Sequence, residues 1–303
     1  MKAWRGLAAI ALATGGLSSA HVRAATCRIR HFSIDRETLA YEDCGHGPVA
    51  IIHPGGPGLN ARYMLGFAKA VADQGYRAIL FEPRGTGRSR GAGVDRGRLT
   101  VSGSVADLEA LRAALDATRI LLIGHSFGGA VVQAYASAHP DHIARLVLLD
   151  SVGPTLGNAP MPLDGWRKRV GPKQLARYDA DRASGDKIAA MRIKFLASFY
   201  HRSRGMAFLR TLDLKNTADL SRLSQSYSKN YHVLASGPKN AFPVSIAAGD
   251  IDWIRGYEPA LIETYPNAQV YQIPHAGHFP WIDAPQATKA LLPDILKGRP
   301  ERP

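Results

Sequence analysis

Six short apolar runs, each bounded by turn residues, recur along the chain. They lie at residues 49–53, 77–82, 119–124, 146–150, 244–248 and 270–273. Continuous apolar runs of this length are typical of strands that are buried on both faces of a parallel sheet. Apolar residues at helical spacing fill three of the intervals, at residues 61–74, 104–117 and 126–139. Strands that alternate with helices predict an α/β fold, with a mostly parallel central sheet flanked by helices.

This alternation stops between residues 154 and 240, where the sequence is helical in character, basic and free of strand-like runs. It resumes at Phe242. The pattern therefore predicts one core, formed by residues 25–153 and 241–303, that is interrupted by a helical insertion at residues 154–240. In such a fold we expect ligands to bind at the carboxyl ends of the strands.

The first 24 residues have the pattern of a secretory signal peptide. Lys2 and Arg5 precede a short apolar stretch, and small residues follow it, with cleavage expected after Ala20 or Ala24. The apolar stretch is much shorter than the roughly 20 residues that a membrane-spanning helix needs. We therefore expect an exported protein, periplasmic or secreted, with no transmembrane segment after signal cleavage.

Export makes the two cysteines of the chain informative. Alternating segments at residues 28–33 and 38–43 flank a polar turn at residues 34–37, which predicts a hairpin. Cys27 and Cys44 are equally far from the centre of that turn, so they would face each other. An oxidising compartment would allow a disulfide between them. The alternative is that the two cysteines are unbonded and serve only as small residues.

The formal net charge of +13 is concentrated in one segment. Residues 151–240 contain sixteen Lys and Arg, six Asp and no Glu. One interpretation is an acidic partner, such as an anionic substrate, an envelope surface or a polymer. The alternative is a solvated helical face. No nucleic-acid-binding motif accompanies the charge, so we expect no nucleic-acid partner.

The run at 119–124 ends in "GHSFGG", which fits G-x-S-x-G between a predicted strand and a predicted helix. In this context the motif holds its serine exposed on a sharp turn, which makes Ser126 the candidate nucleophile. His125 would point away on such a turn, and we interpret it as structural.

A serine hydroxyl needs a base to accept its proton and a carboxylate to orient that base. In chains with this motif the order is serine, acid, histidine. We predict His278, in "AGHFPW", as the base. For the acid we rank Asp252 first, because it lies in the loop beyond a strand; Asp250, nearer the strand end, and Asp150, after an earlier strand, remain alternatives.

Five motifs, "HPGGPG", "PRGTGRS", "GHSFGG", "GDIDW" and "AGHFPWID", occur in this order. Together they resemble the α/β-hydrolase superfamily, and most closely its proline iminopeptidase-like branch. The resemblance implies an α/β-hydrolase fold in which residues 154–240 form a helical cap over the active site. It also implies a Ser126–His278–Asp252 triad, an oxyanion hole formed by the backbone N–H groups of Gly56 and Phe127, and no metal or organic cofactor.

The chain departs from this branch in three places. Pro54 occupies the position of the branch's usual histidine, and Glu82-Pro83 precedes the arginine-glycine loop, where an Asp is common. Proline iminopeptidases anchor the substrate's free amine with cap glutamates, and this insertion has none. A basic cap would repel a cationic amine.

We therefore expect an exported serine hydrolase that cleaves an ester or amide bond of a small molecule or short peptide. If the basic segment binds the substrate, we expect that substrate to carry an anionic group. The alternatives are a carboxylesterase or lactonase without aminopeptidase activity, a cofactor-free haloperoxidase-type enzyme, a carbon–carbon bond hydrolase, and a hydrolase-like binding protein without catalysis.

Overall fold

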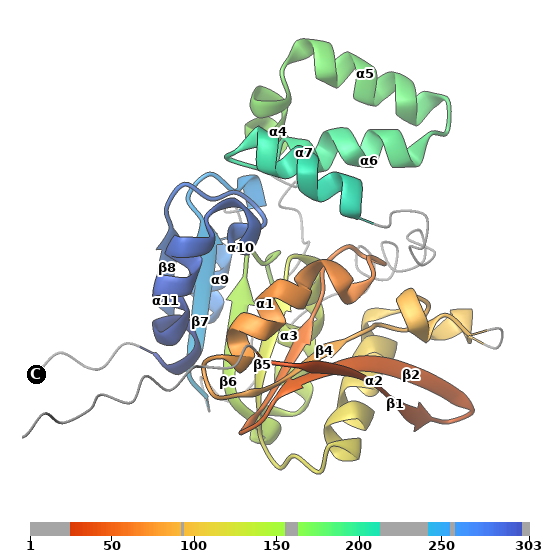
Figure 1. The fold of residues 1–303 in the computed structure, drawn as a ribbon, viewed down its shortest axis with the longest axis vertical. Helices are drawn as coiled ribbons and strands as arrows, with labels where there is room; N and C mark the ends of the chain where they lie inside the picture. Colours follow the sequence, from red (N-terminus) through yellow and green to blue (C-terminus); the bar gives the residue numbers. More distant parts are fainter. Residues whose placement is uncertain (1–24, 92–93, 155–162, 213–241, 255–257, 299–303) are drawn as a thin grey trace, which may run out of the picture.

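The computed structural model describes residues 25–91, 94–154, 163–212, 242–254 and 258–298. The predicted signal peptide at residues 1–24 lies outside this range. Eight strands form one sheet in the order β1-β2-β4-β3-β5-β6-β7-β8 (Figure 1). The strands are β1 (Cys27–Ile34), β2 (Glu37–Gly45), β3 (Val49–His53), β4 (Arg77–Phe81), β5 (Ile120–His125), β6 (Ile143–Leu149), β7 (Val244–Gly249) and β8 (Gln269–Ile273).

The sheet is parallel from β4 to β8, and the antiparallel pairs lie at one edge, where β2 pairs antiparallel with both β1 and β4. The predicted α/β class is therefore confirmed. Strand β6 begins at Ile143, three residues before the predicted run. Its second and third residues, Ala144 and Arg145, are not buried, so the apolar run alone does not reveal the start of the strand.

Helices cover both faces of the sheet. Side chains of α2 (Val101–Ala114), α3 (Phe127–Ala138) and α9 (Glu258–Thr264) belong to one buried cluster, on the first face. Side chains of α1 (Leu65–Ala72), α10 (Pro280–Asp283) and α11 (Pro285–Lys297) belong to the other. Short 3-10 helices join these elements: η1 (Ala61–Met64), η2 (Gly87–Ser89), η3 (Arg96–Arg98) and η4 (Pro140–His142).

The insertion between β6 and β7 is helical, as predicted, in the part that the structure describes. It contains α4 (Leu163–Val170), α5 (Pro172–Ala183), α6 (Lys187–Leu196) and α7 (Arg202–Thr211), which form a separate layer at one end of the molecule (Figure 1). Trp166 of α4 joins the first buried cluster, and Phe208 of α7 joins the second. The insertion is thus anchored in both halves of the core. In the described part of the chain, we find no helix that is long and apolar enough to cross a membrane.

The arginine-glycine loop after β4 is held by ion pairs. The buried guanidinium of Arg84 donates two hydrogen bonds to Asp107 of α2, at 3.0 and 2.6 Å, and also pairs with Glu37. Glu82 accepts hydrogen bonds from the backbone and the side chain of Arg88. Glu82, one of the departures noted above, therefore fixes its own loop through Arg88.

The hairpin formed by β1 and β2 pairs Cys27 directly with Cys44, and the two residues form a disulfide. Cys44 is completely buried against α1, whereas Cys27 lies at the partly exposed start of β1. The bond closes a loop with a sequence separation of 17 residues. It fastens the edge strand, which has only one neighbouring strand, to the rest of the sheet.

We expect reduction of this disulfide to lower the free energy of unfolding by about 3 kcal/mol, because the reduced unfolded chain regains loop entropy. Urea unfolding with and without dithiothreitol measures the difference. The Cys27→Ala/Cys44→Ala double variant is the control, and its stability should not respond to the reductant. Equal stability of oxidised and reduced wild type would contradict the prediction.

Candidate active site

Ser126 lies on the sharp turn between β5 and α3. Its φ of 55° and ψ of −123° are rarely adopted by a residue with a side chain, at a cost of about 1–3 kcal/mol. Backbone hydrogen bonds hold this turn: the N–H of Ser126 donates to Leu149 at 3.1 Å, and its carbonyl accepts from Gly129 and Val152 at 2.9 and 3.2 Å. These contacts with the end of β6, the residues after it and the first turn of α3 hold the serine in the strained conformation.

The second glycine of the G-x-S-x-G motif allows two loops to meet. A Cβ atom on Gly128 would lie only 2.5 Å from the carbonyl oxygens of His53 and Pro54. Only glycine therefore lets the start of α3 pack against the loop that follows β3. This contact brings the "PGGPG" loop next to Ser126.

The three residues of the predicted triad lie in hydrogen-bond contact. The imidazole Nε2 of His278 is 2.9 Å from Ser126 Oγ, and Nδ1 is 2.8 Å from Asp252 Oδ2. A carboxylate can only accept, so Nδ1 carries the proton and Nε2 is free to accept the proton of the serine hydroxyl. All three side chains are buried, with Ser126 8% exposed. In this arrangement the serine hydroxyl faces a base that an acid orients.

The two alternative acids have different partners. Asp250 accepts hydrogen bonds from the backbone N–H groups of His275 and Ala276, at 3.0 and 3.1 Å. Asp150 accepts from the backbone N–H of Gly249 at 2.9 Å. Both carboxylates thus bind backbone groups near the triad, and Asp252 is the one that is hydrogen-bonded to the histidine.

The two adjacent glycines of the glycine loop differ in what their backbone N–H groups contact. The N–H of Gly55 donates to the hydroxyl of Tyr63 at 2.6 Å. The N–H of Gly56 has no hydrogen-bond partner among the described residues, and Gly56 is exposed. Phe127, the other residue expected to contribute an N–H, is the first residue of α3, where the helix carries partial positive charge.

A chain of buried hydrogen bonds runs from this loop to the triad histidine. Tyr63 accepts from Gly55 and donates to Nδ1 of His125 at 2.8 Å, and Nε2 of His125 donates to the carbonyl of His278 at 2.9 Å. Burial raises the pKa of Tyr63. Burial, with His278 nearby, holds the pKa of His125 well below its usual value. Both groups stay neutral, so the chain keeps one arrangement around neutral pH.

His53 supports the loop at the position where this chain departs from the branch. Its buried ring donates from Nδ1 to the carbonyl of Pro54 at 2.9 Å, and burial lowers the pKa of His53 to about 4. The branch's usual histidine is replaced by Pro54, and the imidazole of the preceding residue, His53, binds the backbone of that proline. Pro54 itself is buried at the base of the loop.

Residues 48–285 match the sequence profile of the family described as the alpha/beta hydrolase fold. The chain belongs to the α/β-hydrolase family. The proline iminopeptidase of Xylella fastidiosa is 40% identical over 120 residues, which cover 38% of this chain and 36% of that protein. The chain thus matches little more than a third of that relative's length.

Other similarities cover most of the chain. A 2-hydroxy-6-oxononadienedioate/2-hydroxy-6-oxononatrienedioate hydrolase of Cupriavidus pinatubonensis is 27% identical over 272 residues, covering 84% of this chain and 89% of that protein. An esterase structure from Exiguobacterium antarcticum has a TM-score of 0.68 at 18% identity, and the match covers 88% of this chain and 97% of the esterase chain. At that identity the likeness shows the fold alone.

Two residues that the sequence analysis did not single out hold the histidine loop of this α/β-hydrolase. The carbonyl of Ser198, between α6 and α7, accepts the backbone N–H of His278 at 2.8 Å. The buried Asp283 accepts from the N–H groups of Gly277 and His201, at 2.9 and 2.8 Å. Asp283 ends the "AGHFPWID" motif, so the motif was a signal for it. Ser198 has no local sequence signal.

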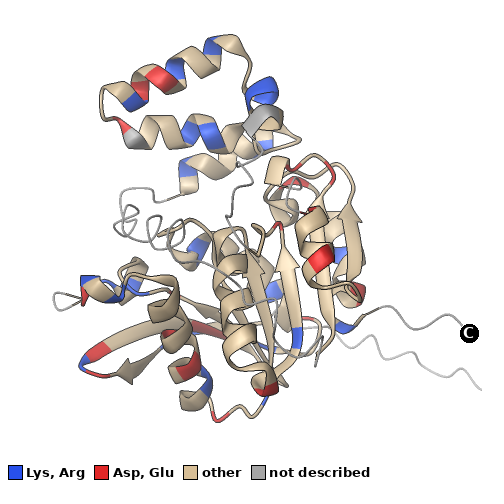
Figure 2. Cartoon of the chain, turned by 180° about the vertical axis from the view of Figure 1, so that it is seen from behind, with Lys and Arg blue, Asp and Glu red and all other residues tan. Residues whose placement is uncertain are grey.

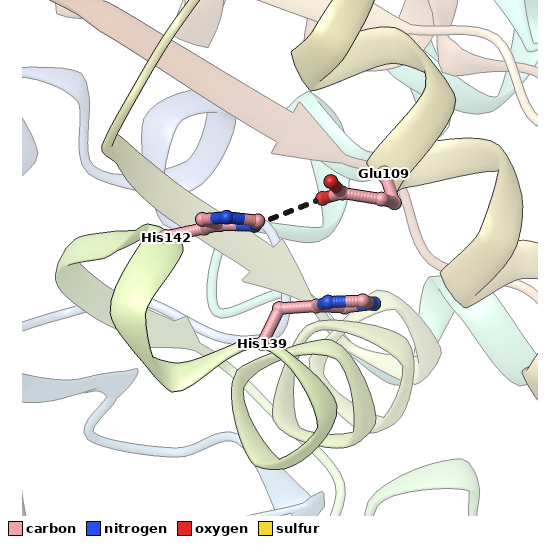
Figure 3. Close-up of side chains that lie close together, drawn as sticks. All are labelled: Glu109, His139 and His142. Atoms are coloured by element: carbon pink, nitrogen blue, oxygen red, sulfur yellow. Dashed lines mark hydrogen bonds and ion pairs between the residues drawn. The ribbon is translucent and has the colours of Figure 1, made fainter.

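A second cluster of titratable groups lies at the opposite end of α3. Glu109 of α2 is hydrogen-bonded to His142 at 3.2 Å, and the ring of His139 stacks on that of His142 (Figure 3). Metal-ligand atoms of these three residues lie within 4.8 Å of one another. However, Arg112 and Tyr135 already donate three hydrogen bonds to the Glu109 carboxylate. We therefore interpret the cluster as a link between α2 and the end of α3.

We expect Asp252→Asn to lower kcat by about 10³–10⁴-fold, because an amide stabilises neither the required tautomer nor the imidazolium. Asp250→Asn is the matched control and should lower kcat far less, because its partners are backbone N–H groups. Steady-state kinetics on an activated ester, with thermal melts to show that each variant folds, provide the measurement. A severe loss in Asp250→Asn with a mild one in Asp252→Asn would reassign the acid.

Tyr63→Phe should lower both activity and stability. It leaves the N–H of Gly55 and Nδ1 of His125 without their shared partner, at a cost of about 1–3 kcal/mol. Because the glycine loop is then no longer held at a fixed position relative to His278, we expect kcat to fall by roughly 10- to 100-fold.

Tyr271→Phe is the control for this variant. It removes a hydroxyl that contacts Gln269 and Asp294 on β8 and α11. It should cost stability and leave kcat nearly unchanged. Equal kcat values for the two variants would contradict a special role of Tyr63.

Proposed function

We propose that the protein is a serine hydrolase that cleaves an ester or amide bond through an acyl-enzyme. One observation carries the proposal: Ser126, His278 and Asp252 form a continuous hydrogen-bonded line in the tautomer that a general base requires. Three groups from distant parts of the chain meet in this way at the carboxyl edge of the sheet, where α/β folds bind ligands.

In the proposed reaction, Ser126 Oγ attacks the scissile carbonyl while Nε2 of His278 takes the serine proton. The imidazolium that forms is stabilised by the carboxylate of Asp252. His278 then donates the proton to the leaving oxygen or nitrogen, which departs from the tetrahedral intermediate. Water, deprotonated by the same Nε2, attacks the acyl-enzyme; His278 then returns this proton to Ser126 Oγ as the carboxylic acid is released.

The backbone N–H groups of Gly56 and Phe127 are our candidates for the oxyanion hole. Gly56 offers a donor with no partner among the described residues, and the start of α3 offers the positive end of a helix dipole. Such donors each contribute roughly 3–4 kcal/mol when they bind the developing oxyanion.

The substrate class is best supported as an ester or a neutral or anionic amide. Relatives are named as proline iminopeptidase and as dienedioate hydrolase, and a structural neighbour is named as an esterase. The insertion of this chain contains no glutamate and an excess of cations, which disfavours a substrate with a free amine. A carboxylesterase or lactonase activity is therefore better supported than an aminopeptidase activity.

We also infer that the protein is exported to an oxidising compartment. The sequence begins with a signal-peptide pattern, and Cys27 and Cys44 form a disulfide. Structural disulfides persist in secreted and periplasmic proteins and are rare in the cytosol.

The proposed nucleophile is tested with a fluorophosphonate probe, which reacts with activated serines. We expect labelling of wild type and its loss in Ser126→Ala. Ser151→Ala is the control, because Ser151 is also buried and follows the end of β6 but donates its hydroxyl to Val152. Equal labelling of wild type and Ser126→Ala would contradict the assignment.

A further inference from the structure

A cation of the insertion lies close to the triad. Nζ of Lys194, on α6, is 5.6 Å from the ring centroid of Trp253, and that centroid is 6.3 Å from the centroid of the His278 ring. Trp253 directly follows Asp252. The ammonium is therefore at most about 12 Å from the imidazole, a span that one substrate molecule can bridge.

The backbone and the aromatic ring at this point are held in place. The carbonyl of Lys194 accepts from Nε1 of Trp166 at 3.2 Å and from the hydroxyl of Ser198 at 3.3 Å. The hydroxyl of Ser198 in turn accepts from Nε1 of Trp253 at 3.0 Å. Lys194 thus belongs to the segment that also binds the backbone of His278.

No carboxylate pairs with this ammonium in the described part of the chain, although Lys194 is half-buried. Burial lowers the pKa of Lys194. The positive charge of Arg182, on α5, lowers this pKa further. Arg182 lies over the ring of Tyr178 at 5.8 Å, and Tyr178 contacts Trp166. Among the described residues no ion pair neutralises either cation, and a bound anion would relieve the repulsion between them.

The surrounding insertion has the same sign of charge. Residues 163–212 contain twelve Lys and Arg against four Asp, and blue segments outnumber red ones on its helices (Figure 2). Like-signed charges around a site raise the local concentration of the opposite ion. A small anion would thus be drawn toward Lys194 from solution.

We propose that Lys194 forms an anion subsite that binds a carboxylate at the end of the substrate remote from the scissile bond. The proposal rests on the hydrolase function above and deepens it. The substrate class is then esters or amides of acids that carry a second, ionised group. Lys194 does not reach the reacting atoms, so its contribution is to binding and selectivity.

The test uses 4-nitrophenyl monoesters of dicarboxylic acids from succinate to sebacate, each paired with its neutral methyl-capped ester. The readout is the ratio of kcat/KM for the anionic and the neutral ester. We expect wild type to favour the anionic ester, with a maximum at one chain length. Lys194→Met should lower that ratio about 10- to 100-fold, mainly through KM, the range for a hydrogen bond to a charged group.

Two further variants separate a local subsite from the general field of the insertion. Lys168→Met removes one exposed charge from α4 and should change the ratio by less than about twofold. Lys194→Glu should reverse the preference and favour the 4-nitrophenyl ester of 6-aminohexanoate. An unchanged ratio in Lys194→Met, or an equal fall in Lys168→Met, would overturn the proposal.

A binding measurement keeps this inference separate from the hydrolase function. Calorimetric titration of the Ser126→Ala protein with suberate requires no turnover. We expect binding that weakens at least about tenfold when Lys194→Met is added. Equal binding with and without Lys194 would refute the subsite, whereas an unlabelled Ser126 in wild type would refute the hydrolase alone.

Discussion

The buried hydrogen-bond chain from Gly55 through Tyr63 and His125 to His278 is the interaction on which the arrangement of the site depends. It joins the glycine loop, the turn that carries Ser126 and the histidine loop. Each buried donor or acceptor that loses its partner costs about 1–3 kcal/mol, so none of these loops can shift alone. The strain at Ser126 is maintained because its neighbours are held in this way.

The helical insertion is part of the site as well as a layer above it. Its Ser198 carbonyl holds the backbone of His278, and Asp283 of the core holds the backbone of Tyr200 and His201 in return. Arg169 donates to the carbonyls of Ala197 and Phe199, on either side of Ser198. Movement of the insertion would therefore be transmitted to the base, and its charged groups are held at a defined place beside it.

The fold was predictable because its signals are local. Parallel strands are apolar on both faces, so β3, β4 and β5 appear as continuous runs within about a residue of their observed bounds. Helices near the end were not predicted: α9 and α10 are short, and Pro293 within α11 obscures its helical pattern. The first turn of the helix expected at residues 61–74 is instead the 3-10 helix η1, in which the side chain of Asn60 accepts a hydrogen bond from the N–H of Arg62.

The sequence by itself determined the α/β class, the helical insertion and the side chains from which the triad is drawn, because each depends on residues that are neighbours along the chain. Only the tertiary structure decided which of three aspartates meets His278, since Asp150 follows β6, Asp250 and Asp252 both follow β7, and their local sequences do not show which carboxylate faces the histidine loop. It also decided that Tyr63, Ser198 and Lys194 belong beside the site. These residues come from η1, from the α6–α7 connection and from α6, and contacts between such distant segments have no periodicity or motif in the sequence.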